Sequence, residues 1–217
     1  MTMSVTGAQA NPDAVSVQIK AVSHAGISQT TWTAKAKPPF PKSYSGPVSF
    51  HSLRTNPVNT SQTNEKAGQA TVGYTLTGTQ SFSDGTMTAW YDLTSLNISS
   101  VTYKDTDGGC TMTVPPFAPG PVDDSGDALV LSIAPDGSWT YMASAYHVFG
   151  IMQATSSCPN PPQSVVPIFD FRTRPATGSR ARPMSPRGAI SGNDPTGIFS
   201  GATDIVAGAT WALTPSD

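Results

Sequence analysis

The chain has 217 residues, of which 12% are charged, and its formal net charge is −2 at pH 7. This length suits one large β-domain or two small ones, and the charge excludes a globally basic nucleic-acid binder, so no nucleic-acid partner is expected. No run of 18 apolar residues occurs, so no membrane-spanning helix is expected. The chain is rich in serine and threonine and contains 19 glycines and 20 prolines. This mixture disfavours helices and favours strands joined by turns.

The N-terminal part of the chain carries weak periodic signals. Residues 1–14 lack a regular apolar pattern and predict a flexible N-terminal arm. Apolar and polar residues then alternate weakly over Val15–Val22, which predicts a strand, and a second candidate strand covers Gln29–Ala36. Three prolines within Pro38–Pro41 predict a rigid break, because proline removes a backbone donor that a sheet needs. We expect residues 15–217 to form one domain after the arm.

The middle of the chain predicts hairpins. Val48–Leu53 is a candidate strand, whereas Asn56–Gly68 is polar and predicts a loop. Beyond it, apolar and polar residues alternate with the period of a half-buried strand. Asp-Gly is a strong cue for a tight hairpin turn, because glycine adopts a positive φ without steric cost. Such pairs separate three sets of candidate strands, at Asp84-Gly85, Asp107-Gly108 and Asp136-Gly137.

The C-terminal part returns to strands after an irregular segment. Val148–Ala154 and Val165–Phe171 are candidate strands, residues 172–187 predict a long loop rich in arginine and proline, and Ile190–Thr214 again predicts strands. With three hairpins and no helical periodicity, the chain is predicted to be all-β, as an antiparallel β-sandwich with multiple hairpins. A closed β-barrel is the alternative, because either architecture deals with sheet edges.

No catalytic motif is visible. The sequence contains no GxSxG elbow, HExxH pair, P-loop or GxGxxG loop, so we predict no catalytic residues and favour a protein that is not an enzyme. A pair of carboxylates from separate strands is enough for a glycosidase, however, and needs no local motif. A hydrolase with an Asp-based site therefore stays open, and a pocket lined by two Asp side chains about 5–10 Å apart would support it.

The two cysteines, Cys110 and Cys158, predict a disulfide. In the chain-entropy model, closing the loop between them stabilises the folded state by ~4 kcal/mol. The alternative is two buried, unpaired thiols. Disulfides persist in oxidising compartments, so we expect a secreted, periplasmic or cell-surface protein. No signal peptide is visible at the start of the chain, so we expect any leader to lie outside this sequence.

One acidic cluster is a candidate metal site. Calcium prefers six to eight oxygen ligands from flexible loops, and clustered aspartates supply them. The loop between two candidate strands carries more carboxylates than a turn needs, at Asp123, Asp124 and Asp127. The alternative is turn chemistry alone, since Asp and Gly are common in hairpins. We therefore expect no cofactor, and calcium is the one exception that this cluster leaves open.

Two further groups of residues are candidates for ligand binding. The predicted loop carries five arginines within 16 residues that contain no acid, which suits an anionic glycan, a phosphate or an acidic protein face: Arg172, Arg174, Arg180, Arg182 and Arg187. The alternative for these is a solvated loop. Trp139 and Tyr141 are two residues apart on a candidate strand, so they share a face and are predicted to form an exposed platform for a sugar ring. The alternative for these rings is core packing.

The sequence thus leaves three functional hypotheses. The hydroxyl-rich, weakly charged composition and the hairpin loops favour a non-catalytic secreted or surface binding or adhesion domain, whose ligand is a glycan or a protein. The alternative is a structural subunit of a virion, a phage tail or a pilus-like assembly, which the same composition suits. The hydrolase with an Asp-based site is the further alternative.

Overall fold

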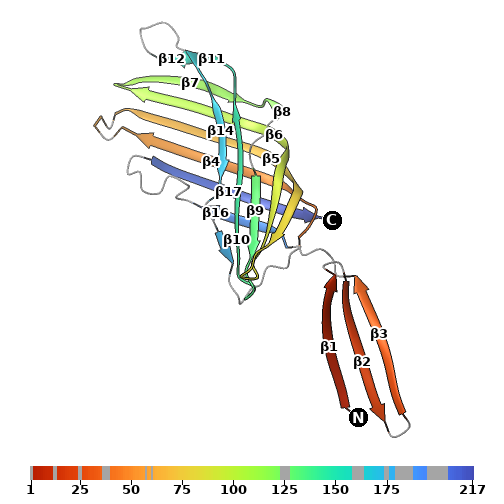
Figure 1. The fold of residues 1–217 in the computed structure, drawn as a ribbon. Coiled ribbons are helices and arrows are strands. Elements are labelled where there is room, and N and C mark those ends of the chain that lie inside the picture. Colours follow the sequence, from red (N-terminus) through yellow and green to blue (C-terminus); the bar gives the residue numbers. More distant parts are fainter. Residues whose placement is uncertain are drawn as a thin grey trace. The chain divides into compact units, whose positions relative to one another are not determined.

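The computed structural model describes residues 2–11, 14–23, 26–35, 40–56, 58–59, 61–122, 128–157, 164–173, 176–178, 188–194 and 205–217. Every regular element in these ranges is a strand, and the strands pair antiparallel (Figure 1). The predicted all-β antiparallel class is confirmed. In the part of the chain that the structure describes, no helix is long and apolar enough to cross a membrane.

The chain divides into two compact units, Met1–Phe40 and Pro41–Asp217. The first unit is a three-stranded meander in the order β1-β2-β3, made of β1 (Thr2–Asn11), β2 (Ala14–Ser23) and β3 (Gly26–Lys35). The division falls at the proline break, whereas the sequence suggested a boundary between residues 14 and 15. Residues 2–11, expected in a flexible arm, pair with β2 along most of their length. Their threonines and valine favour extended backbone, although their alternation is too weak to mark a strand.

The second unit is built on one large sheet. Twelve of its described strands belong to this sheet, whose main path runs β14-β10-β9-β6-β5-β4-β17-β16, and β11 pairs with β13 in a separate two-stranded sheet. The strands are β4 (Ser43–Thr55), β5 (Thr63–Ser81), β6 (Met87–Asp107), β7 (Cys110–Phe117), β8 (Gly120–Val122), β9 (Ala128–Ile133), β10 (Trp139–Val148), β11 (Met152–Gln153), β12 (Thr155–Ser156), β13 (Ser164–Val165), β14 (Ile168–Arg172), β15 (Ala176–Gly178), β16 (Ile190–Asp194) and β17 (Ile205–Ser216).

The three predicted Asp-Gly turns are confirmed. They join β5 to β6, β6 to β7 and β9 to β10. Gly85, Gly108 and Gly137 have φ values of 84°, 56° and 82°, which only glycine adopts readily. In the first turn, the Asp84 carboxylate accepts a hydrogen bond from the Thr86 amide at 2.9 Å. Local turn chemistry therefore sets the register of these hairpins.

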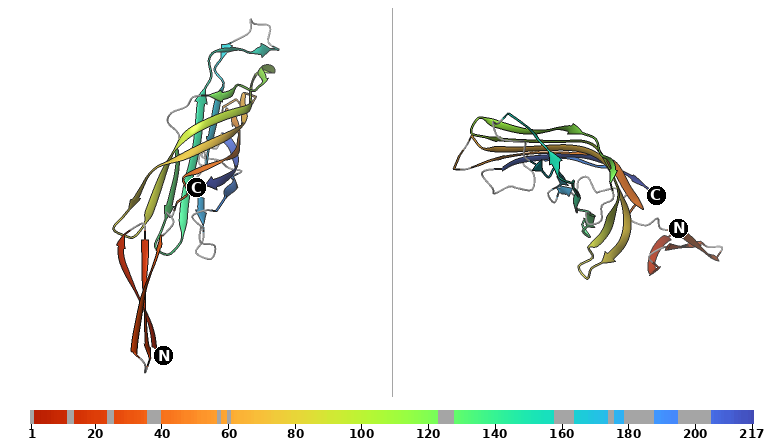
Figure 2. Two further views of the ribbon diagram at one scale, coloured as in Figure 1. Left: turned by 90° about the vertical axis from the view of Figure 1, so that its right-hand side faces the viewer. Right: turned by 90° about the horizontal axis from the view of Figure 1, so that it is seen from above.

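The large sheet bends back over itself. Strands β5 and β6 are 19 and 21 residues long, and their pairing shifts register at three places, between Gln69/Ala70, Gly73/Tyr74 and Leu76/Gly78. Such shifts bend and twist a strand pair. In Figures 1 and 2, β10 and β14 cross one face of the layer formed by β4, β5, β6 and β17, and β14 contacts both β4 and β5. The result is a two-layer, sandwich-like packing. The described strands do not close into a barrel, since β14 and β16 end the path.

Aromatic residues hold the two layers together. The Phe50 ring on β4 meets the Phe169 ring on β14 edge to face, with centroids 5.2 Å apart. Nearby, the Trp211 indole on β17 donates a 2.8 Å hydrogen bond to the Tyr141 hydroxyl on β10. The Tyr74 hydroxyl on β5 donates to the Ser144 carbonyl on β10 at 2.8 Å. These contacts bury aromatic area and satisfy the polar groups that come with it.

The aromatic pair between the layers depends on a glycine beneath it. A Cβ atom at Gly68 would lie 2.5 Å from the Phe50 ring and 2.8 Å from the Phe169 ring. We expect Gly68→Ala to lower the free energy of unfolding by about 1–3 kcal/mol, because the rings must shift to admit the methyl group. Urea denaturation followed by fluorescence measures this change.

Gly78, on the same strand, is the matched control, because nothing lies within 4 Å of the corresponding Cβ position. Gly78→Ala should leave the stability unchanged or raise it slightly, since alanine restricts the unfolded chain. Equal stability of the Gly68→Ala variant and the wild type would show that the two layers do not meet as described.

Candidate functional site

The inner face of the large sheet, which faces the second layer, changes from apolar to polar toward one end. Cross-strand neighbours on β4, β5 and β6 form successive rows along this face. In order, the rows are Phe50–Gly68–Val101, Ser52–Lys66–Tyr103 and Arg54–Asn64–Asp105. The first row is buried, and the third is partly or fully exposed. The strands therefore continue beyond the core and carry polar side chains on the same face.

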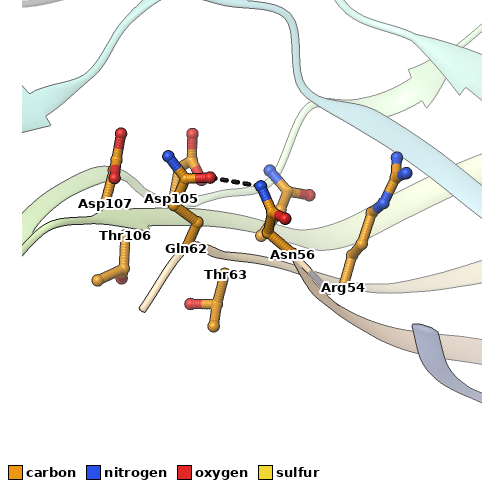
Figure 3. Close-up of a pocket in the computed structure, with 8 residues that line it drawn as sticks. Arg54, Asn56, Gln62, Thr63, Asp105, Thr106 and Asp107 are labelled. Carbon is orange, nitrogen blue, oxygen red and sulfur yellow. Dashed lines mark hydrogen bonds between the residues drawn. The ribbon is translucent and has the colours of Figure 1, made fainter. Parts of the chain in front are cut away.

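A hollow of about 390 Å³ lies at this polar end (Figure 3). All of its lining residues are polar, and we call it the polar pocket. They come from the end of β4 and the segment after it, the start of β5 and the end of β6, and are Arg54, Asn56, Gln62, Thr63, Asn64, Asp105, Thr106 and Asp107. Figure 3 shows Thr63 and Thr106 pointing to the other side of the sheet, as alternation along a strand requires. The remaining six side chains therefore supply the chemistry of the pocket.

The turn between β4 and β5 positions the amide side chains. The Asn56 side-chain oxygen accepts a hydrogen bond from the Val58 amide at 2.9 Å, and the Asn56 side-chain nitrogen donates to Gln62 Oε1 at 2.5 Å. The backbone of Asn56 also donates to the Gln62 carbonyl at 2.9 Å. Deeper in the pocket, the Asn64 side chain donates to the Tyr103 hydroxyl at 3.0 Å, which leaves its Oδ1 as an acceptor.

Two carboxylates form one wall of the pocket. Asp105 and Asp107 are alternate residues of β6, so they share a face with their Cα atoms roughly 7 Å apart. Burial raises the pKa of Asp105, and the Asp107 carboxylate raises it further, whereas the Thr106 backbone amide and Lys66 lower it. Figure 3 shows Arg54 on the opposite side of the hollow from these carboxylates. The pocket thus offers strong acceptors on one wall and strong donors on the other.

Two other hollows, of about 480 and 400 Å³, lie on the sheet and share Ser49, Gln69 and Thr210. Their described linings contain hydroxyl and amide groups but no carboxylate, lysine or arginine. Of these three hollows, the polar pocket is the one whose described lining carries both carboxylates and a guanidinium, and we treat it as the candidate functional site.

The predicted exposed platform of Trp139 and Tyr141 is wrong for Tyr141. The two rings do share a face and stack, with centroids 5.3 Å apart and an interplanar angle of 22°. Tyr141 is only 4% exposed, however, because the bend of the sheet places β10 against β17 and brings the Tyr141 hydroxyl to Trp211. The Trp139 ring is partly buried, and its Nε1 is fully so. These rings belong to the core, which was the alternative interpretation.

The arginine cluster is described at one position. The Arg172 side chain donates a hydrogen bond to the Asp170 carboxylate at 2.7 Å, and its guanidinium lies 5.7 Å from the centroid of the Tyr146 ring. Its charge is therefore partly neutralised within β14. The other candidates lie outside the described residues: Arg174, Arg180, Arg182 and Arg187 of the cluster, and Asp123, Asp124 and Asp127 of the calcium loop. Anion and calcium binding there stay predictions.

The pairing of the described strands is consistent with the predicted disulfide between Cys110 and Cys158, although it does not include the bond itself. Strand β12 pairs antiparallel with β7, with Thr155 opposite Thr113 and Ser156 opposite Met112. Beyond these pairs, the Ser157 backbone donates to the Thr111 carbonyl at 2.9 Å. Cys110 and Cys158 are the next residues on either side of that bond. Cys158 lies outside the described residues, so the disulfide stays a prediction.

Two local features hide the polar pocket in the sequence. The polar segment Asn56–Gly68 predicts a loop, whereas β5 begins at Thr63. Asp107 is accounted for by the hairpin turn that follows it. The available signal was the alternation Asp105-Thr106-Asp107 at a strand end, which places two carboxylates on one face.

No family model, curated protein or solved structure matches this chain.

The raised pKa of Asp105 predicts that this residue weakens the fold near neutral pH. The folded state holds the Asp105 proton more tightly than the unfolded state, whose carboxyl titrates near the ordinary aspartate pKa of 3.8. The penalty is present above the folded-state pKa and disappears as the pH falls toward 3.8. We expect Asp105→Asn to be more stable than the wild type at pH 7, with a smaller difference at about pH 3, as measured by urea denaturation.

Asp92→Asn is the matched control, since it removes the same charge from an exposed position of the same strand. A loss of stability in Asp105→Asn at pH 7 would mean that Asp105 supports the fold, contrary to this expectation.

Proposed function

We propose that this protein is a non-catalytic binding domain that takes a short, uncharged carbohydrate in the polar pocket. The observation that carries the proposal is a hollow of about 390 Å³ whose lining is polar throughout. Sugar hydroxyls both donate and accept hydrogen bonds, so they match a wall of carboxylate and amide oxygens that faces a guanidinium. The volume is near the lower end of the range for small-molecule sites, roughly 300–1,000 Å³, which suits one or two sugar rings.

The charges of the pocket restrict the class of sugar. The described lining contains two carboxylates and one guanidinium, and the two carboxylates lie together on one wall. Carboxylated or sulfated sugars would bring a further negative charge beside Asp105 and Asp107, which is unfavourable. Neutral sugars and amino sugars avoid this repulsion. None of the described lining residues is aromatic, so binding rests on hydrogen bonds, and we expect a modest affinity, with a Kd of about 0.1–1 mM.

An exported location belongs to the same proposal. The low share of charged residues and the predicted Cys110–Cys158 disulfide are both typical of secreted, periplasmic or cell-surface domains. Glycans are abundant in these places, so the location and the proposed ligand agree.

A glycan array followed by calorimetry tests the proposal. We expect the wild type to bind neutral or amino sugars and to reject their acidic counterparts. Asp105→Asn should weaken binding by roughly tenfold or more, because a charged acceptor is lost. Since this variant is expected to be at least as stable as the wild type, the loss would not reflect unfolding.

The control is again Asp92→Asn, which should bind as the wild type does. An array without hits among neutral and amino sugars, or a ligand whose affinity is the same in Asp105→Asn, would refute the proposal.

A hydrolase is retained as a second candidate, because the pocket contains the carboxylate pair on which that hypothesis depends. The Cα atoms of Asp105 and Asp107 lie roughly 7 Å apart on one face of the strand, and side-chain rotation can bring their carboxyl groups to the separation of about 6.5–9.5 Å that inverting glycosidases use. In such a reaction, Asp107 would take a proton from water as the water oxygen bonds to the anomeric carbon. Asp105, whose pKa is raised by burial, would donate its proton to the departing glycosidic oxygen.

Chromogenic glycosides of the sugars that bind on the array distinguish the two candidates. A hydrolase should release the chromophore, with a rate that falls at least about a hundredfold in Asp107→Asn and not in Asp92→Asn. Binding without turnover would eliminate the hydrolase and leave the binding domain.

A further inference from the structure

A row of uncharged polar side chains crosses the outer face of the large sheet, which is the face turned away from the second layer. Strands β16, β17, β4, β5 and β6 follow one another along the sheet path, and each contributes one residue (Figure 1). Cross-strand pairing places these residues in line, and we call them the outer row: Asn193, Thr210, Ser49, Gln69 and Ser100. With neighbouring strands about 4.8 Å apart, the outer row is roughly 19 Å long.

The two hollows of about 480 and 400 Å³ lie on either side of the outer row. Each is lined by the same three members of the row, Ser49, Gln69 and Thr210, so the hollows adjoin along it. Small residues flank the row and leave this space open, with Ala67 and Gly208 in the larger hollow and Ala212 in the smaller one. A ligand that lies along the row can therefore approach the sheet closely on both sides.

The outer row can donate and accept hydrogen bonds along its length without carrying a charge. The hydroxyl oxygens of Ser49 and Thr210 are 2.5 Å apart and hydrogen-bonded to each other, which restrains both side chains. Among the described residues, the side chains of Asn193, Gln69 and Ser100 have no hydrogen-bond partner. Their amide and hydroxyl groups are therefore open to a ligand, and each amide offers both donors and an acceptor.

These features restrict the class of ligand. The described linings contain no lysine or arginine, so an acidic polymer gains no ion pair here. An extended peptide typically adds to the edge of a sheet through its backbone, whereas the outer row crosses the middle of a face. A neutral polysaccharide presents hydroxyl groups that both donate and accept. The rings of an extended polysaccharide recur at nearly the spacing of the strands, so successive rings can meet successive residues of the row.

We propose that the outer row binds an extended, uncharged polysaccharide chain that lies across the five strands. The rings occupy the two hollows, and their hydroxyl groups bond to the row, above all to the amide of Gln69 at its centre. A chain of about four rings spans the row. The inner-face residues that supply the chemistry of the polar pocket lie on the opposite side of the sheet, so this second site goes beyond the proposed function and does not depend on it.

Native gel electrophoresis with a polysaccharide cast in the gel tests the proposal, because it detects weak binding as a loss of mobility. We expect galactomannan or xyloglucan, whose backbones are extended and neutral, to slow the wild type. Alginate, which is acidic, should not slow it. The double variant Gln69→Ala/Thr210→Ala should weaken binding at least about tenfold, because two hydrogen-bonding side chains are lost from the row.

The matched control is Thr79→Ala/Gln80→Ala, which removes the same two residue types from β5 outside both hollows. All four side chains are exposed, so both variants should keep the urea midpoint of the wild type. The control should also keep its mobility loss in the gel. A wild type that neither neutral polysaccharide slows, or an equal effect of the two double variants, would overturn the proposal. None of the four positions lines the polar pocket, so this comparison holds whether or not short sugars bind there.

Discussion

The contact between the two ends of the large sheet is the constraint on which the second unit depends. Phe50 meets Phe169 above Gly68, and Trp211 bonds to Tyr141, so strands that are distant along the sheet path face each other. Without these contacts the sheet would be a single bent layer with an exposed apolar face. The aromatic pair fits because Gly68 has no side chain. The hydrogen bond between the Trp211 indole and the Tyr141 hydroxyl satisfies polar groups that would otherwise be buried without a partner.

The same arrangement explains where the polar pocket lies. The second layer covers the inner face of β4, β5 and β6 at Phe50, Gly68 and Val101, and the strands continue past the covered region. Side chains beyond it keep the same orientation but meet water, so Asn64 and Asp105 occupy positions that would otherwise extend the core. The pocket is thus a rigid extension of the sheet, and its floor is held by the backbone pairing of three strands. Rigid strands are a favourable support for a binding site, because they fix side chains with little loss of entropy on binding.

The proposed sugar binding gives Asp105 a role that opposes its effect on stability. Its carboxylate is partly buried beside Asp107, which raises its pKa and makes its charged form unfavourable for the fold. Nothing in the sheet requires two acids at this point, since alternate polar residues of any kind would continue the strand. Binding of a ligand by Asp105 and Asp107 would explain why the chain carries both acids despite their cost to stability.

The sequence by itself determined the class of the protein and its local turns. Hydroxyl-rich composition, period-two alternation and Asp-Gly pairs such as Asp136-Gly137 are local properties, and local sterics are sufficient to make strands and hairpins of them. The extent of β5 was underestimated because its polar start at Thr63–Lys66 pairs with β4 and β6, and such pairing is invisible in a single segment.

Tertiary structure decided the rest. Whether Tyr141 is exposed or buried depends on the bend that brings β10 against β17, and the residues that meet there are 70 positions apart in the chain. The polar pocket likewise combines Arg54 and Asn64 with Asp105 across three strands. Contacts between distant segments depend on sheet order and register, and these are set by the packing of the whole chain.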